Sequence, residues 1–286
     1  EFPEARAAEG ATEVEFDIIV GNPPYGGGVL GYGEETLTEP YITSGLDIVA
    51  LFIERQLSLL DDDGYFGNVA SLKIAFDADM EPVIDLFREK LDKTEISCFA
   101  KRPRCVFEGV EVRIALITGQ IDIKQDDEEI EENIHTSEFI RFNEEDRNER
   151  LHGLEHRSID DYILYEDGID GSDNYVAIPK HGTERIEGII QKLKEIDENI
   201  LDRKSSNETD HAIWRREGQD YFVAPHYDRI SGYNPRELRP FYFESELEAR
   251  TAFLGICSSL FYLYWCVYAD QYHVNLSHVN AFPLPH

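Results

Sequence analysis

An apolar run that leads directly into two prolines is the feature of this sequence that most constrains the fold. Residues 16–28 read FDIIVGNPPYGGG, and the apolar centre IIV predicts a short strand buried on both faces, as in parallel sheets. Proline lacks a backbone N–H and has a fixed φ, so the two prolines must end the pairing of this strand. Asn22 and Tyr25 would therefore lie at the carboxyl end of a buried strand, where open α/β sheets bind ligands.

Helices and strands alternate after this first strand. The alternation predicts an α/β fold, with a parallel-type sheet that carries helices on its faces. The expected elements are a helix over 46–60 that ends at DDDG (61–64), a strand over 65–71, a helix over 81–91 that begins near Pro82, and strands over 94–100 and 112–119.

The rest of the chain divides into an acidic segment and a second unit. The acidic segment has few large apolar residues, which is typical of a linker or an exposed excursion. The second unit contains a helical pattern near 183–199, an apolar helix-like stretch at 246–265 and a closing NLSHVNAFPLP at 275–285. We therefore expect three parts, at residues 1–120, 121–174 and 175–286.

The net charge restricts the partners of the chain. Fifty-eight acidic residues face 27 basic ones, which gives a formal net charge of −31 and should repel nucleic acid in ordinary buffer. The acids are dispersed, with one dense run, DDEEIEE, at 126–132, and the aromatic content of 12% argues against disorder. Such a surface is typical of halophilic adaptation, because at molar salt the Debye length is only about 3 Å and a polyanionic partner is no longer excluded. An acidic interaction surface is the alternative.

Several common kinds of site and location are not indicated. No apolar stretch approaches the roughly 20 residues of a membrane span and no signal peptide is visible, so we expect a cytoplasmic protein without a membrane partner. The cysteines show no CxxC spacing, so neither a disulfide framework nor a zinc site is predicted. GGGVLG (26–31) fits G-x-G-x-x-G but opens no helix, and we interpret it as a loop over DNA or cofactor. We expect no metal and four structural histidines, His211, His226, His273 and His278.

The order Asn-Pro-Pro-Tyr suits chemistry on a planar amine. An amine such as adenine N6 is a poor nucleophile because its lone pair is delocalised into the ring. The side-chain oxygen of Asn22 and a carbonyl fixed by Pro23 and Pro24 can both accept hydrogen bonds from it, which is electrostatic preorganisation. Tyr25 supplies a flat face on which an extruded base can stack. A turn that only closes a strand is the alternative, but it would not require this order of residues.

The segment FDIIVGNPPY (16–25) resembles motif IV of the class I, AdoMet-dependent adenine-N6 DNA methyltransferases of restriction–modification systems. The type IIG and Taq-type branch is the most similar. The helix and strand at 44–71 are similar to those that follow motif IV, and CVFEGVEVRIALITG (105–119) resembles motif VIII. The resemblance implies the C-terminal part of a Rossmann-like sheet followed by an α+β target-recognition domain. It also implies S-adenosyl-L-methionine as cofactor and double-stranded DNA as substrate, with the catalytic residues Asn22, Pro23, Pro24 and Tyr25.

Two further aromatic residues acquire roles from the resemblance. Phe107 matches the motif VIII aromatic that stacks on the second face of the flipped adenine, and Phe52 would lie with Asn22 near the AdoMet adenine. For both phenylalanines an ordinary place in the core is the alternative.

Basic residues are the candidates for contacts to DNA in a chain this acidic. The cluster KRPR (101–104) is the best of them because it closely precedes Phe107, and a solvated surface charge is the alternative for each residue. The stretch 258–285 resembles the close of target-recognition regions in type IIG enzymes. The predicted DNA contacts are Lys101, Arg102, Arg104, Arg215 and Arg216.

The resemblance also implies a partner for the first strand. In this branch the AdoMet loop lies upstream of motif IV, whereas only residues 1–21 precede Asn22. We therefore expect a missing N-terminal AdoMet-binding segment, without which the strand at 16–21 would present a bare edge and favour self-association.

Three other functions stay open. Protein glutamine-N5 methyltransferases carry a similar NPPY, but the long stretch 26–286 after Tyr25 indicates a further domain and a large substrate. A remnant that only binds DNA and a noncatalytic subunit of a defence complex are the others.

Overall fold

The chain folds into two compact units. The computed structural model describes residues 16–25, 42–43, 46–107, 109, 111–121, 133–167, 172–216, 218, 223–227 and 238–284. Unit 1 comprises Glu1–Asp161 and His181–Thr183, and unit 2 comprises Tyr162–Lys180 and Glu184–His286. The stretches 26–31 and 126–132, singled out in the sequence, lie outside the described residues.

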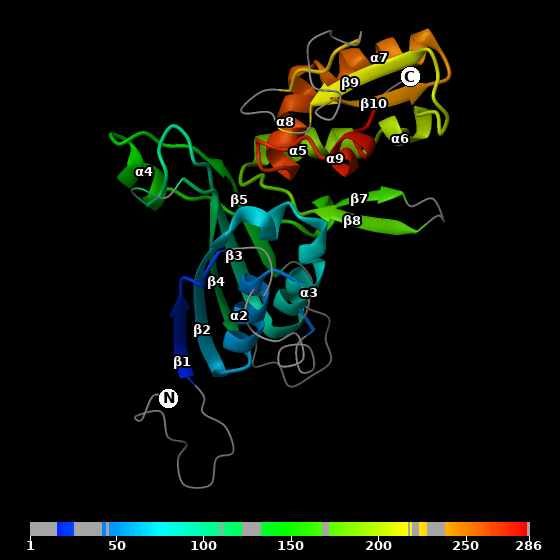
Figure 1. Cartoon of the computed structure of the whole chain (residues 1–286). Helices are drawn as coiled ribbons and strands as arrows, with labels where there is room; N and C mark the ends of the chain where they lie inside the picture. Colours follow the sequence, from blue (N-terminus) through cyan, green and yellow to red (C-terminus); the bar gives the residue numbers. More distant parts are fainter. Residues whose placement is uncertain are drawn as a thin grey trace. The chain divides into compact units, whose positions relative to one another are not determined.

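Unit 1 is built on a six-stranded mixed sheet with the order β1-β2-β4-β3-β5-β6 (Figure 1). Two pairs, β1–β2 and β3–β5, are parallel, and the other three pairs are antiparallel. The prediction of a parallel-type sheet is therefore correct for β1, β2, β3 and β5, which run in one direction, and wrong for β4 and β6, which run against them. Strand β3 can return as an antiparallel β4 because the described residues between them form no crossover helix. The strands are β1 (Phe16–Gly21), β2 (Leu60–Ser71), β3 (Leu91–Phe99), β4 (Ile114–Ile121), β5 (Ile134–Ile140) and β6 (Arg157–Ser158).

Two helices of unit 1 cover one face of this sheet (Figure 1). Helix α2 (Ile48–Leu57) begins where the Asp47 side chain accepts a hydrogen bond from the Val49 amide, and α3 (Glu81–Lys90) has its proline in the first turn, as predicted. Most apolar residues of both helices are buried in the core, and Phe52 of α2 is an exception. The remaining short helices of this unit are η1 (Leu72–Ala75), η2 (Ala78–Met80) and α4 (Arg147–His152), and η3 (Asp160–Tyr162) spans the boundary between the units.

Strand β1 is less buried than the sequence predicted. Ile18 is 64% exposed and Val20 is 77% exposed, so the expected burial on both faces is wrong. The reason is its position: β1 is the end strand of the sheet, and among the described residues it pairs only with β2. The DDDG stretch at 61–64 does not follow a helix end directly but lies inside β2, where the pairing with β1 is interrupted.

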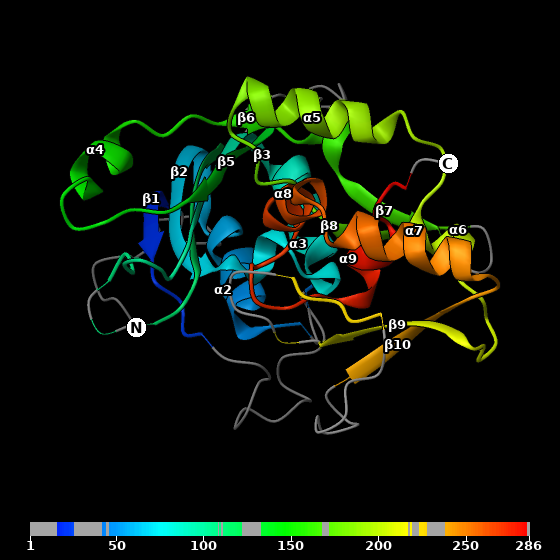
Figure 2. The same ribbon diagram turned by 90° about the horizontal axis from the view of Figure 1, so that it is seen from above.

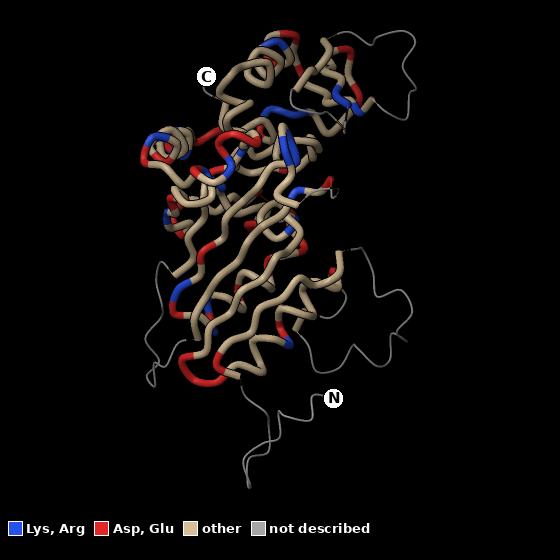
Figure 3. Tube along the Cα trace, turned by 90° about the vertical axis from the view of Figure 1, so that its left-hand side faces the viewer, with Lys and Arg blue, Asp and Glu red and all other residues tan. Residues whose placement is uncertain are grey.

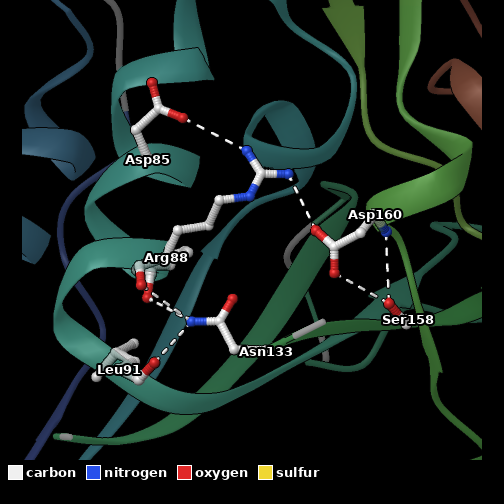
Figure 4. Close-up of polar contacts among 7 residues, drawn as sticks. Asp85, Arg88, Leu91, Asn133, Ser158 and Asp160 are labelled. Atoms are coloured by element: carbon white, nitrogen blue, oxygen red, sulfur yellow. Dashed lines mark hydrogen bonds and ion pairs between the residues drawn. The ribbon is translucent and has the colours of Figure 1, made fainter. Parts of the chain in front are cut away.

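The segment 121–174, expected to be a linker or an excursion, instead contributes β5 and β6 to the sheet. Two contacts tie it to α3 (Figure 4). The Asn133 side chain donates to the Leu91 carbonyl at 2.7 Å, at the end of α3, and Arg88 pairs with Asp160 at 3.3 Å. The boundary of the first compact unit therefore lies near residue 161.

Unit 2 has its own apolar core, centred on the aromatic residues of α8. Helix α7 lies beside the β9–β10 ribbon, and α8 packs against α7 (Figures 1 and 2). None of the described helices alone is long and apolar enough to cross a membrane; only α7 and α8 together, bent by 64°, have that length and composition. The elements are β7 (Leu164–Asp167), β8 (Asp173–Ala177), α5 (Glu184–Lys194), α6 (Ile200–Arg203), β9 (His211–Arg216), β10 (Leu238–Phe243), α7 (Glu246–Ile256), α8 (Ser259–Tyr268) and α9 (Leu276–Asn280).

Acidic residues occur along both units and do not gather in one patch of the described chain (Figure 3). This distribution agrees with the dispersed acids of the sequence.

Candidate functional site

Several chain segments meet at one edge of the unit 1 sheet. Strands β1 and β2 are parallel and end at the same side, and β4 begins there because it runs antiparallel to β2. Strand β3 also ends there, because it is antiparallel to β4. The residues after β1, the basic loop after β3 and the segment after β5 therefore share this edge, which we call the carboxyl edge.

The turn after β1 presents an asparagine and a tyrosine to each other. Pro23 is buried, whereas Asn22 and Pro24 are exposed. The Tyr25 hydroxyl donates to Oδ1 of Asn22 at 2.7 Å and lies 3.4 Å from the Val69 carbonyl oxygen. Partial burial raises the pKa of Tyr25, so its hydroxyl stays protonated and acts as a donor. The Asn22 oxygen is thus held as an acceptor at the carboxyl edge.

The glycine at the end of β1 lies close to the side chains of Asn68 and Gln56. A Cβ at Gly21 would meet Oδ1 of Asn68 and Nε2 of Gln56, each at 2.6 Å. These two side chains form an amide pair between β2 and α2, in which Asn68 donates to Gln56. Only glycine leaves room for that pair directly before Asn22.

Phe107 lies at the same edge and is 40% exposed, so it is not a core residue. It lines a hollow of about 180 Å³ together with the basic loop 101–104 and with Phe142, Glu144 and Arg147. The preceding residue, Val106, is buried in a small apolar cluster. The structure therefore places an accessible aromatic ring next to cationic side chains.

Phe52 projects from α2 and is 44% exposed. The alternative of an ordinary core position is therefore excluded for this residue as well. An exposed aromatic ring on the helix that follows the Asn-Pro-Pro-Tyr turn is compatible with a stacking role.

Two cations of the basic loop are already paired with carboxylates. Arg102 contacts Glu111 at 3.3 Å, and Arg104 contacts Glu144 at 3.2 Å. All four side chains are exposed by half or more, so these ion pairs contribute little stability and can be exchanged for other anions. Lys101 lines the same hollow.

Arg215 of unit 2 has a different environment from the one expected. Its side chain is buried, lies 5.3 Å from the centre of the Phe241 ring and donates to the Val274 carbonyl. A guanidinium so placed serves packing and is not accessible to DNA. Arg216 is exposed, because successive residues of β9 point to opposite faces. That alternation was the sequence signal that separates the two arginines.

Two histidines of unit 2, His273 and His278, make structural contacts through their rings. The ring of His278 is buried and bonds to the Tyr268 carbonyl at 3.1 Å through Nε2, and burial lowers its pKa to about 4. His273 bonds to Asp270 at 2.8 Å through Nδ1. Among the described residues, no group of three or more His, Cys, Asp or Glu side chains could hold a metal ion.

The sequence did not reveal Arg147 as a neighbour of this site. Its Nη2 atom donates to the Val106 carbonyl at 2.7 Å, although the two residues are 41 positions apart. The surrounding stretch NEEDRNER is typical of a solvated surface, and no local signal distinguishes this arginine from the others.

The carboxyl edge thus collects the Asn22 oxygen as an acceptor, the rings of Tyr25 and Phe107, and exchangeable cations, all within the first part of the chain. Residues 1–107 match the sequence model of the Eco57I restriction-modification methylase. The methylase match includes the Asn22–Tyr25 turn, Phe52, the basic loop and Phe107. The resemblance to restriction–modification methyltransferases is confirmed at this level for that part of the chain. No curated protein matches the chain significantly.

Solved structures of restriction–modification proteins are distantly similar. The DNA-bound type IIL enzyme MmeI shares 14% identity, with 92% of this chain and 45% of that chain covered and a TM-score of 0.46. The M protein of EcoKI shares 14% identity over 48% and 28% of the two chains, with a TM-score of 0.31. A type I restriction–modification complex shares 21% over 40% and 22%, with a TM-score of 0.30. The chain spans less than half of each of these proteins, and at these values the likenesses carry no argument about its activity.

Proposed function

We propose that this chain supplies the catalytic edge and a DNA-reading unit of a restriction–modification methyltransferase. The reaction is methyl transfer from AdoMet to the N6 amine of an adenine extruded from double-stranded DNA. The observation that carries the proposal is the Tyr25–Asn22 hydrogen bond at the carboxyl edge, inside the segment that matches the methylase model.

The hydrogen bond supports a specific role for Asn22. The Tyr25 hydroxyl shows that Oδ1 of Asn22 can accept a hydrogen bond from a neighbouring donor, as it would from a substrate amine. An adenine NH₂ would replace this hydroxyl and donate to Oδ1 and to the Pro23 carbonyl. Both acceptors are fixed before the substrate arrives, so they favour the amine geometry in which the nitrogen lone pair is free to react.

Two aromatic rings would then hold the extruded base. Tyr25, released from Asn22, would stack on one face and Phe107 on the other, as every base offers a π-face. Arg102 and Arg104 would leave their carboxylate partners and bind the phosphates that flank the extruded base.

The cofactor would be held by Asn22 and Phe52, whose exposed ring fits a stacking contact with an adenine moiety. When bound, AdoMet supplies the electrophilic methyl group. We further propose that a segment carrying the rest of the cofactor pocket pairs with the edge of β1 that has no partner strand among the described residues. In calorimetry, residues 1–286 alone should bind AdoMet poorly and should bind it after the segment is added. Micromolar binding by residues 1–286 alone would contradict this second proposal.

Unit 2 would select the DNA sequence, with exposed Arg216 among its contacts. Exchange of unit 2 for that of a related enzyme should then change the recognised sequence and leave the chemistry unaltered. If the recognised sequence stays with unit 1, this assignment is wrong.

Labelled AdoMet tests the reaction and separates it from the glutamine alternative. The enzyme is offered double-stranded DNA in one reaction and a glutamine-containing peptide in another, at molar and at low salt. We expect label in N6-methyladenine only. Label in the peptide glutamine and none in DNA would overturn the proposal.

A further inference from the structure

The chain returns to the carboxyl edge after β5 as an arm, which we define as residues 141–156 and which includes α4. Its first anchor is Phe142, a fully buried ring packed edge-on against Phe99 at 6.4 Å between ring centres. The Ala100 amide also bonds to the Ile140 carbonyl at 2.9 Å, directly before the arm. The arm is therefore attached to the start of the basic loop.

The second anchor of the arm is Arg147. Its Nη2 atom donates to the Val106 carbonyl at 2.7 Å, and the side chain of Val106 is itself buried. A loop carbonyl without a ladder partner needs such a donor, and a charged donor makes the stronger bond. The residue before Phe107 is thus held through both its side chain and its carbonyl, whereas the Phe107 ring stays accessible.

A small apolar cluster connects the arm to both aromatic residues of the site. Leu151 and Leu154 of the arm pack against this cluster, and so does Val69 of β2, whose carbonyl oxygen lies 3.4 Å from the Tyr25 hydroxyl. A shift of the arm would therefore change the packing of Val106, next to Phe107, and of Val69, next to the Tyr25 hydroxyl. The buried members of the cluster are Phe99, Val106, Ile114, Ile140 and Phe142.

We infer that the arm is a positioning element for the second wall of the base pocket, and that Arg147 is the positioning residue that fixes Phe107. This inference rests on the proposed function, since Phe107 acts as a wall only if a base enters. It assigns a role at the site to residues 141–156, which the sequence had placed in a linker.

Hydrogen exchange on the unliganded chain tests the anchor without any substrate. Arg147→Ala should accelerate exchange of the Val106 and Phe107 amides about tenfold, the effect of losing a bond from a charged donor. Arg150→Ala is the matched control: Arg150 is on the same helix, has the same charge, and its ion pair among the described residues is with Asp146 of the same arm, at 3.7 Å. It should leave exchange at Val106 and Phe107 unchanged.

The catalytic consequence is read from turnover and from base extrusion. With DNA carrying 2-aminopurine at the target, Arg147→Ala should reduce the fluorescence increase and lower kcat about tenfold, with DNA affinity similar to that of Arg150→Ala. Arg147→Lys keeps the charge but not the planar guanidinium group. Its fluorescence increase and its kcat should therefore lie between those of Arg147→Ala and those of the unaltered enzyme.

A wrong inference about the arm and a wrong proposed function would give different results. If Arg147→Ala leaves exchange at Phe107 unchanged, or if Arg150→Ala accelerates it equally, the arm does not position the loop. If exchange responds but the unaltered enzyme methylates no DNA, the proposed function is wrong and the arm is only a loop anchor.

Discussion

The carboxyl edge of unit 1 and the core of unit 2 hold polar side chains in different ways. At the edge, Arg104 is exposed and pairs with the exposed Glu144 side chain, and the Tyr25 hydroxyl donates to the exposed Asn22 side chain, so both partners can exchange. In unit 2, Arg215 and His278 are buried and bonded to backbone carbonyls, which cannot leave. The partner of a polar group, more than its residue type, therefore distinguishes the candidate site from the structural core.

The largest expected effect is at the edge. Asn22→Ala should lower methyl transfer by about 100- to 1000-fold, because one of two preorganised acceptors is lost. DNA affinity and the free energy of unfolding should change little, since Asn22 is exposed. The measurement is kcat together with DNA affinity. Tyr25→Phe is the control: it removes the competing hydroxyl, keeps the ring and should retain activity within about tenfold. Near-normal turnover of Asn22→Ala would contradict the proposed catalytic role of Asn22 at the carboxyl edge.

The core of unit 2 should respond to pH. Burial holds the pKa of His278 at about 4, against an ordinary value of 6.5, so below pH 6.5 the unfolded state binds a proton that the folded state refuses. The free energy of unfolding should therefore fall between pH 6.5 and 4, by up to about 3 kcal/mol from this group. Hydrogen bonds from His273 lower the pKa of Asp270, so its contribution is lost only at still lower pH.

Tryptophan fluorescence in urea measures this loss, since both tryptophans, Trp214 and Trp265, belong to unit 2. His278→Gln removes the titration and should flatten the pH dependence in that window. An equally steep dependence in the variant would place the titrating group elsewhere.

The two adjacent arginines of β9 sharpen the comparison inside unit 2. Arg215→Met should lower the free energy of unfolding by about 2 kcal/mol, because the Val274 carbonyl loses its charged donor. Arg216→Ala, its neighbour on the exposed face, should change it by less than about 0.5 kcal/mol. Urea unfolding of both variants is the measurement, and equal effects would contradict the assignment of Arg215 to the core.

The smallest effect on stability is expected at the basic loop. Arg104→Ala should change the free energy of unfolding by less than about 0.5 kcal/mol, because its ion pair with Glu144 is exposed. Its effect should appear in DNA binding, as a reduction of the salt slope by about 1. Glu144→Gln frees the cation and should bind DNA as well or better. A large decrease in the free energy of unfolding in Arg104→Ala would show that this arginine, like Arg215, has a structural role.

The sequence determined the local parts of the molecule. Helix α3 starts at its proline, α2 follows its apolar spacing, and the Asn-Pro-Pro-Tyr turn ends β1, because each signal acts within a few residues. The chemistry proposed for Asn22 and Tyr25 was also readable from residue order, since it depends on neighbours in the chain.

Tertiary structure alone decided the rest. The mixed order of the sheet, the exposure of Val20, the burial of Arg215 and the contact of Arg147 with Val106 depend on segments far apart in the sequence. Strand direction and burial are set by which surfaces meet after the chain has folded. The same strand sequence is found whether or not another part of the protein covers one face of the strand, so the sequence alone does not show its burial. For that reason an acidic segment with few large apolar residues predicted a linker or an excursion where the structure has strands β5 and β6 of the sheet.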